Sequence, residues 1–433
     1  MLSLPQLPQS SRPVEPVMQA LPRLSFNKFS GKLASTKFNI TPHKIIRVFR
    51  GLIVVLWFLF CVLPFVVLQF IYFPILRRLN KNLLEIATQL LENLFGYFIA
   101  GTMNLYCPHK LVFTGKKSDF NYFRPDSSID WFKMANLHGA VLMSNHQIYA
   151  DWLYLWALGY YYSFAHYIKF VAKYEISKIP IFGRALGLIG TVFLKRQWEL
   201  DKPLLQSSFD EFKRSDNKKI LIIFPEGTTV NPKFIKKSDE FADINNLKKT
   251  NHVLIPKTSG TFFCIQALKD KMPYLYDLTI AYSGLSSNDC PEYSYPLTRM
   301  FTRIKYPKEI HINISRYSIT SQVPLEEEIF SEWLIDKYHL KDTMLDFFYK
   351  NNHFPHDPAF YSQNIDPKLS NSFKSHLDNS DPAKTSSELN SCSEIISETI
   401  IPSTSFFILK ALCIISAPYS ILYLHYFLFS MIF

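Results

Sequence analysis

Residues 141–151 read VLMSNHQIYAD, and this stretch changes from apolar to polar at Ser144. The apolar run predicts a buried strand that ends where polar side chains reach solvent. His146 and Asp151 are five positions apart, so on one regular helix they would lie roughly 140° apart around its axis. If a helix begins near Tyr149 instead, Asp151 lies in its first turn and can point back at the imidazole. The stretch therefore predicts a strand, a turn that contains His146, and a helix.

Two interpretations of His146 and Asp151 fit this stretch. In the first, the carboxylate hydrogen-bonds one ring nitrogen, which fixes the tautomer and leaves the other nitrogen as a base. In the second, His146 caps the helix and Asp151 only complements the helix dipole. The stretch by itself does not distinguish them.

Three further stretches place polar groups at strand ends. In ILIIFPEGT (220–228) a buried strand stops before Glu226 and Gly227, whose turn exposes backbone amides to a ligand. In PIFGRALGLIGTVFLKR (180–196) a strand ends in Lys195 and Arg196, two cations suited to a phosphate group. VLIPKTSG (253–260) adds another cation, Lys257.

Apolar stretches alternate with helical patterns between residues 111 and 318. Strands are predicted at residues 111–114, 140–143, 168–172, 192–194, 220–224, 253–255, 278–282 and 310–314. Helices are predicted to begin near Tyr149, Ile181, Pro203 and Ser259, and an amphipathic helical region covers 324–351. This alternation predicts an α/β layered domain.

Both ends of the chain carry uncharged runs. Residues 51–76 hold no charge, and as a helix they would be roughly 39 Å long against a hydrocarbon core of ~30 Å. Pro64 and Pro74 leave open a kinked span or a segment that enters and returns. Residues 83–105 are predicted to pack against the first segment at the membrane interface, and residues 411–433 are long enough to span.

The formal net charge is +11, and eight of the 47 Lys and Arg residues precede Gly51. A basic leader before an apolar segment predicts a disordered arm near an anionic membrane surface. No basic stripe interleaved with aromatics is present, so nucleic acid is not expected as a partner. The six cysteines lack the spacing of a zinc or redox site, which predicts no metal, reduced thiols and a domain that faces the cytosol.

The blocks NHQIYAD, PIFGRALGLIGTVFLKR, FPEGT and VLIPKTSG occur in the order and spacing of four blocks of the glycerolipid acyltransferase family, which includes the 1-acylglycerol-3-phosphate acyltransferases. The resemblance covers roughly residues 111–355. DWLYLW, Trp198, Asp201 and KDTMLDFFYKNNHFP most resemble the lysocardiolipin and lysophosphatidylinositol acyltransferase branch. Two positions differ: Thr229 and Lys257 stand where arginine is common.

The resemblance implies an enzyme that transfers an acyl group from acyl-CoA to the free hydroxyl of a lysophospholipid, such as a lysophosphatidylinositol-like lipid or lysophosphatidate. It makes His146 and Asp151 the catalytic base and its partner, with no metal and no cofactor beyond acyl-CoA as co-substrate. The substrate-binding residues it implies are Glu226, Gly227 and Thr228 at the glycerol backbone or its turn, and Lys195, Arg196 and Lys257 at the phosphate. Thr229 in place of arginine predicts a lysolipid with a headgroup beyond its phosphate.

Two other functions are open on the same residues, a CoA-independent phospholipid transacylase and a non-catalytic membrane lipid-binding protein. The expected location is the endoplasmic reticulum or a related internal membrane. The expected segments are a disordered basic leader (1–46), N-terminal membrane helices (47–105), the acyltransferase domain (106–355), a flexible linker (356–405) and a C-terminal transmembrane helix (406–433).

Several charged or titratable residues near these blocks are predicted to have no catalytic role. His138 and His166 lack an acid at the matching offset and are predicted to be structural. Lys173 and Lys178 are predicted to be surface charges. The lysines at 233, 236 and 237 are predicted to lie in a solvated loop.

Overall fold

The computed structural model describes residues 42–79, 81–116, 119, 139–161, 164–179, 182–215, 218–303, 305–364 and 395–400. The predicted leader, except for its last residues, and the predicted C-terminal transmembrane helix lie outside these ranges. Contacts divide the chain into Met1–Ile46 and Arg47–Phe433, and nearly all the described elements belong to the second unit.

One sheet of eight strands forms the centre of that unit, in the order β4-β3-β5-β2-β6-β7-β1-β8. The strands are β1 Lys110–Lys116, β2 Gly139–Ser144, β3 Ile168–Lys173, β4 Val192–Leu194, β5 Lys219–Ile223, β6 Tyr274–Tyr282, β7 Glu309–Ser318 and β8 Ile395–Ile400. The run from β4 to β6 is parallel, whereas β6 pairs antiparallel with β7. Parallel strands covered on both faces read as continuous apolar runs, as β2 and β5 do. The predicted α/β layered class is therefore correct.

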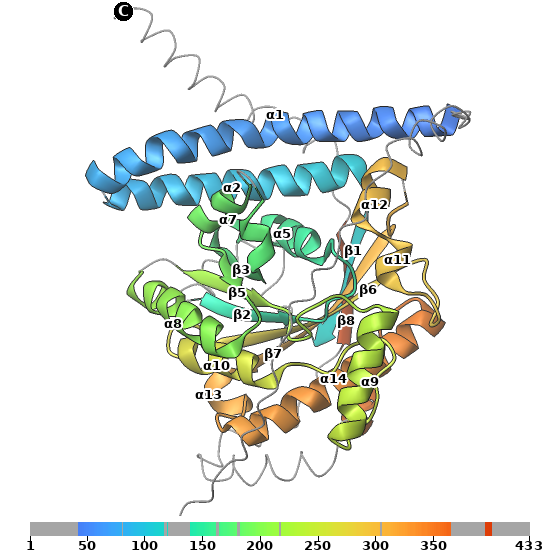
Figure 1. The fold of residues 1–433 in the computed structure, drawn as a ribbon. Coiled ribbons are helices and arrows are strands. Elements are labelled where there is room, and N and C mark those ends of the chain that lie inside the picture. The colour runs from blue at the N-terminus through green and yellow to red at the C-terminus, as the bar shows by residue number, and fades with distance from the viewer. Residues whose placement is uncertain are drawn as a thin grey trace, which may run out of the picture. The chain divides into compact units, whose positions relative to one another are not determined.

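Helices cover both faces of the sheet, and Figure 1 shows α5 and α14 on opposite sides of it. The helices are α1 Pro42–Leu79, α2 Lys81–Tyr106, α5 Asp151–Tyr161, η2 Ala165–Tyr167, α6 Tyr174–Ser177, α7 Phe182–Leu188, α8 Trp198–Arg214, α9 Pro232–Ile244, α10 Thr258–Leu268, α11 Pro291–Ser294, α12 Leu297–Arg303, α13 Ile319–Gln322, α14 Glu327–Asn351 and α15 Pro358–Gln363. On one face α2 packs on α5 through Phe95 and Trp156, whose ring centroids are 4.8 Å apart. On the other, α10 packs on α14 through Phe262 and Phe330, at 5.3 Å.

The first two helices pack against each other, as predicted. Trp57 Nε1 of α1 donates to Thr102 Oγ1 of α2 over 3.1 Å, and the rings of Phe58 and Phe98 lie 5.5 Å apart. The helix α1 is continuous through Pro64 and Pro74. Within the described residues, no helix combines the length and apolar character needed to cross a membrane. Membrane insertion of residues 47–105 therefore stays a prediction.

Three local predictions were wrong, and two correctly predicted strands were too short. Residues 253–255 are not a strand, because the backbone N–H groups of Leu254 and Ile255 bond the side chains of Glu226 and Ser238 instead of a neighbouring strand. The helix α8 begins at Trp198, five residues before Pro203. The lysines at 233, 236 and 237 lie in the helix α9, whose start is fixed by the Asn231 side chain accepting from Phe234 N. The β6–β7 pair extends the last two strands to Tyr274 and Ser318.

Two elements lie in the segment 356–405, which was expected to be a flexible linker. The helix α15 begins after Asp357, whose side chain accepts from Ala359 N over 2.8 Å. The strand β8 pairs antiparallel with β1, from Leu111 opposite Ile400 to Lys116 opposite Ile395. The sequence pattern did not reveal β8, because this short edge strand is defined by its pairing with β1 and not by a long apolar run. Part of the expected linker thus belongs to the folded domain.

Candidate active site

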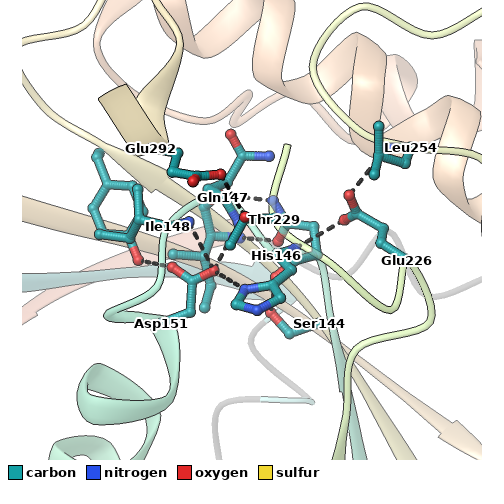
Figure 2. A network of polar contacts seen from close by, with 12 residues as sticks. Ser144, His146, Gln147, Ile148, Asp151, Glu226, Thr229, Leu254 and Glu292 are labelled. Atoms are coloured by element: carbon teal, nitrogen blue, oxygen red, sulfur yellow. Dashed lines mark hydrogen bonds and ion pairs between the residues drawn. The ribbon is translucent and has the colours of Figure 1, made fainter. Parts of the chain in front are cut away.

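The carboxylate of Asp151 organises the turn after β2. Asp151 is the first residue of α5 and is fully buried. Its Oδ2 accepts from the backbone N–H of Gln147 at 2.7 Å and of Ile148 at 3.1 Å, and lies 2.8 Å from His146 Nδ1 (Figure 2). Because a carboxylate accepts, Nδ1 carries the proton and Nε2 has the free lone pair. The geometry matches the first interpretation, because Asp151 contacts one ring nitrogen, and Asp151 also binds two backbone N–H groups of the turn.

The ring of His146 is held from its other side as well. It stacks on Phe224 at the end of β5, with ring centroids 4.3 Å apart and an angle of 24° between the planes. The backbone oxygen of His146 accepts from Val230 N over 3.0 Å. The His146 side chain is 16% exposed, so solvent and substrate reach only part of the ring. A base held by a carboxylate, with one edge open, is the arrangement that proton transfer requires.

Glu226 contacts the backbone of the site. One carboxylate oxygen accepts from His146 N at 2.8 Å and the other from Leu254 N at 3.0 Å, so Glu226 joins the turn after β2 to the loop before α10 (Figure 2). Burial raises the pKa of Glu226 to about 8, against the two hydrogen bonds that lower it. Of the two roles implied for Glu226, its contacts match the shaping of the turn.

Tyr282 is part of this network although the sequence pattern did not single it out. It is the last residue of β6, it is fully buried, and its hydroxyl donates to Asp151 Oδ1. In the sequence, Tyr282 is one more aromatic residue of an apolar strand. Its hydroxyl group is the only feature that could have indicated a polar contact. Its contact depends on β6 lying beside β2 in the sheet.

Arg196 and Lys257 lie beside Gly227, Lys173 lies near enough to Arg196 to feel its charge, and we refer to these three residues as the cation cluster. The guanidinium of Arg196 donates to the Gly227 carbonyl oxygen, and a side chain added at Gly227 would lie 3.4 Å from Lys257 Nζ. Burial first and the charge of Arg196 second lower the pKa of both Lys173 and Lys257. Lys173, which was expected to be an isolated surface charge, thus joins two predicted phosphate ligands.

The turn that presents Arg196 is shaped by a buried acid. Asp201 accepts from Lys195 N at 2.7 Å and from Gln197 N at 3.0 Å, and between them Arg196 adopts a φ of 63°. The ammonium of Lys195 lies 5.2 Å over the ring of Tyr174, the residue that follows Lys173. Asp201 therefore binds backbone N–H groups of the turn in the block 180–196, as Asp151 does in the turn after β2.

Comparisons with known proteins match the part of the chain that contains this site. The family described as Acyltransferase matches residues 132–283, which include every residue of the site described above, and the family described as Acyltransferase C-terminus matches residues 299–373. The chain belongs to the glycerolipid acyltransferase family. Its class of reaction is therefore acyl transfer.

Related members of the glycerolipid acyltransferase family carry several substrate names. The chain is 35% identical over 217 residues to a probable 1-acyl-sn-glycerol-3-phosphate acyltransferase 5 of Arabidopsis thaliana, matching 50% of this chain and 55% of that protein. It is 32% identical over 253 residues to a 2-acyl-1-lysophosphatidylinositol acyltransferase of Saccharomyces cerevisiae, matching 51% and 64%. It is 29% identical over 301 residues to lysocardiolipin acyltransferase 1 of Mus musculus, matching 67% and 70%. The match thus covers less than two thirds of the length of the Arabidopsis thaliana and Saccharomyces cerevisiae relatives.

Two threonines of this acyltransferase that follow Gly227 point into the protein. Thr228 is buried, and its hydroxyl has no hydrogen-bond partner among the described residues. Thr229 is fully buried and donates to Glu292 of α11, which also accepts from Asn231 Nδ2 at 3.0 Å. The side chain of Thr229 is thus enclosed on the α11 side, and the headgroup preference inferred from the missing arginine stays a prediction.

Two histidines that were predicted to be structural, and the expected absence of a metal site, complete the comparison with the sequence. Burial lowers the pKa of His166 to about 4, which keeps its ring neutral and suits a structural role. His138 lies outside the described residues. Among the residues that are described, no group of three or more His, Cys, Asp or Glu side chains is placed to hold a metal ion.

Proposed function

We propose that this acyltransferase transfers a fatty acyl group from acyl-CoA to the free hydroxyl of a lysophospholipid, with His146 as general base. The observation that carries the proposal is the Asp151–His146 hydrogen bond at the carboxyl end of β2, which leaves Nε2 with a free lone pair on a side chain that is partly exposed. Arg196 and Lys257 of the cation cluster lie beside Gly227, the residue that follows Glu226. Glu226 in turn binds the backbone N–H of His146.

The chemistry needs no enzyme nucleophile. His146 Nε2 takes the proton of the lysophospholipid hydroxyl as its oxygen attacks the thioester carbonyl, and Asp151 stabilises the imidazolium that forms. When the tetrahedral intermediate collapses, the carbon–sulfur bond breaks and the imidazolium returns the proton to the leaving thiolate. The products are a diacyl phospholipid and CoA.

The cation cluster supports an anionic acceptor or donor near the turn. Arginine and lysine are the usual protein ligands of phosphate groups, and both lysolipids and CoA carry them. Relatives named for lysophosphatidate, lysophosphatidylinositol and lysocardiolipin chemistry suggest a glycerophospholipid acceptor. We therefore take Arg196 and Lys257, with Lys173, as the phosphate ligands.

A membrane location is part of the proposal. Side chains of α1 that are apolar and exposed support contact with lipid, and they include Val48, Phe49, Leu52, Val55, Leu56 and Leu59. Free Cys107, Cys264 and Cys290 fit a reducing compartment. We propose an internal membrane such as the endoplasmic reticulum, with the catalytic domain on the cytosolic side.

The test is an assay of the purified full chain in mixed micelles. Labelled acyl-CoA is offered with lysophosphatidylinositol, lysophosphatidate, lysocardiolipin and lysophosphatidylcholine, and a labelled phospholipid without CoA is offered in parallel. CoA-dependent transfer that is lost in His146→Ala supports the proposal. Transfer from the phospholipid alone would show a transacylase, and lipid binding without any transfer would show a non-catalytic protein.

A further inference from the structure

We propose that Tyr282 is a positioning residue of the catalytic pair, which orients the Asp151 carboxylate through its hydroxyl and thereby sets the basicity of His146. The inference rests on the proposed function in assigning His146 as the base. It adds a residue from β6, a strand outside the four sequence blocks.

The two oxygens of Asp151 divide their contacts. Oδ2 receives His146 Nδ1 and the backbone N–H groups of Gln147 and Ile148. Oδ1 receives the hydroxyl of Tyr282, and no other donor to it is found among the described residues. A carboxylate whose two oxygens are bound on opposite sides cannot rotate about its terminal bond without breaking both sets. The Tyr282 contact therefore keeps Oδ2 directed at the imidazole.

The hydroxyl of Tyr282 is fixed as a donor. Burial first and the charge of Asp151 second raise the pKa of Tyr282 well above its ordinary value, so the phenol keeps its proton at any working pH. A donor on Oδ1 withdraws part of the negative charge that would otherwise stabilise the His146 imidazolium. Removing this donor should strengthen the attraction of Asp151 for an imidazolium at His146 and also let the carboxylate turn.

Titratable groups on each element packed around the pair lie near it. They are Asp151 and Tyr154 on α5, Glu226 after β5, Tyr282 on β6 and Tyr349 on α14. Tyr154 provides a matched control. It is fully buried, its ring centroid lies 5.8 Å from that of Tyr282, and its hydroxyl has no hydrogen-bond partner among the described residues. Tyr154→Phe removes one buried phenol oxygen beside the pair, whereas Tyr282→Phe removes the same atom together with its bond to Asp151.

The first experiment compares the wild type, Tyr282→Phe and Tyr154→Phe as full chains, after thermal melting shows that each is folded. We expect Tyr282→Phe to lower kcat about 10-fold with little change in KM, and to move the acidic limb of the kcat/KM profile to higher pH. Tyr154→Phe should follow the wild type. A Tyr282→Phe enzyme with the rate and pH profile of Tyr154→Phe would overturn the inference.

A second measurement needs no turnover. The rate at which diethyl pyrocarbonate modifies His146, followed by peptide mass spectrometry across pH, reports the fraction of neutral imidazole. We expect the midpoint for His146 to rise in Tyr282→Phe and to stay at the wild-type value in Tyr154→Phe. A shifted midpoint in a protein that acylates none of the lysolipids would uphold the positioning role while contradicting the proposed function. An unshifted midpoint would contradict the positioning role itself.

Discussion

The carboxylate of Glu226 accepts a hydrogen bond of 2.8 Å from the backbone N–H of His146, a residue 80 positions earlier in the chain. The same carboxylate accepts from Leu254 N. Contact with the glycerol backbone was one expected role of Glu226, but its carboxylate instead fixes the backbone of His146. A turn of this kind has no regular hydrogen-bond partner for its N–H groups, and a buried carboxylate supplies one. The effect of Glu226 on catalysis is therefore expected to pass through the position of His146.

Above about pH 8, where Glu226 of the folded protein is ionised, Glu226→Gln should lower both stability and turnover. An amide accepts through its oxygen only, so one of the two backbone N–H groups, that of His146 or that of Leu254, loses its partner in a buried place. The expected cost is about 1–3 kcal/mol in the free energy of unfolding, with kcat reduced about 10-fold. Thermal melting and steady-state assays measure the two effects. A variant with the wild-type Tm and a raised KM alone would instead place Glu226 at the substrate.

The pKa of Glu226 predicts how stability changes with pH. Burial raises this pKa to about 8 in the folded protein, above its ordinary value of 4.5. Between these two pH values the folded state holds the proton more than the unfolded state does, so the contribution of this group to stability falls as pH rises from about 4.5 to about 8. We expect the Tm of the wild type to fall over this window relative to Glu226→Gln. Parallel curves for the two proteins would contradict the raised pKa.

His146 and Asp151 are predicted to act as one unit. His146→Ala should reduce turnover by at least ~10², and Asp151→Asn should give a similar loss because the amide permits the wrong tautomer. The double variant should be scarcely slower than either single one. Single-turnover rates and acyl-CoA binding separate chemistry from affinity. Losses that add would mean that the two residues have separate roles.

Gly227 needs a backbone that other residues adopt at a cost. Its φ is +68°, and a side chain there would meet the end of Lys257. Gly227→Ala should cost about 1–2 kcal/mol of stability and displace the carbonyl that Arg196 binds, which lowers activity. Gly260→Ala is the control, because its added carbon meets nothing within 4 Å in the helix α10 and should be neutral or stabilising. Equal Tm values for the two variants would contradict the predicted cost of a side chain at Gly227.

Lys257 is predicted to bind substrate phosphate. Lys257→Met removes one charge of the cation cluster and should raise KM for the anionic substrate about 10-fold while kcat changes less. Lys249→Met serves as the control, since Lys249 is exposed and pairs with Asp243 at 2.8 Å. Kinetics at constant ionic strength make the comparison. The assignment fails if both lysine variants raise KM equally.

A buried ion pair ties α2 to the sheet. Lys169 of β3 donates to Glu92 of α2 and, over 2.8 Å, to the carbonyl oxygen of Ile189. Lys169→Met should cost about 3–5 kcal/mol because it leaves a buried carboxyl without a partner, and adding Glu92→Leu should recover much of that loss. Lys110→Met, at the exposed pair with Glu309, should cost less than about 1 kcal/mol. Chemical unfolding ranks the variants, and equal costs at the two pairs would contradict the prediction.

The residues of one stretch were enough to predict much of this site. The apolar run before Ser144 and the polar turn after it predicted β2, the turn and α5, because strands and turns depend on neighbours in the chain. The His146–Asp151 contact was one of the two interpretations that this local geometry left open, and the structure shows it. The alternation of apolar stretches and helical patterns between residues 111 and 318 predicted the α/β class in the same way.

Only the tertiary structure decided which distant groups meet the catalytic pair. Tyr282, Glu226 and Leu254 reach the turn because β5 and β6 flank β2 in the sheet, an order that the sequence does not record. Pairing with β1 also makes residues 395–400 a strand. Residues 253–255 are not a strand, because no neighbouring strand offers them hydrogen bonds. Local pattern sets what a segment can form, whereas packing sets what it contacts. The direction in which Glu226 and Thr229 point could therefore not be predicted from the sequence.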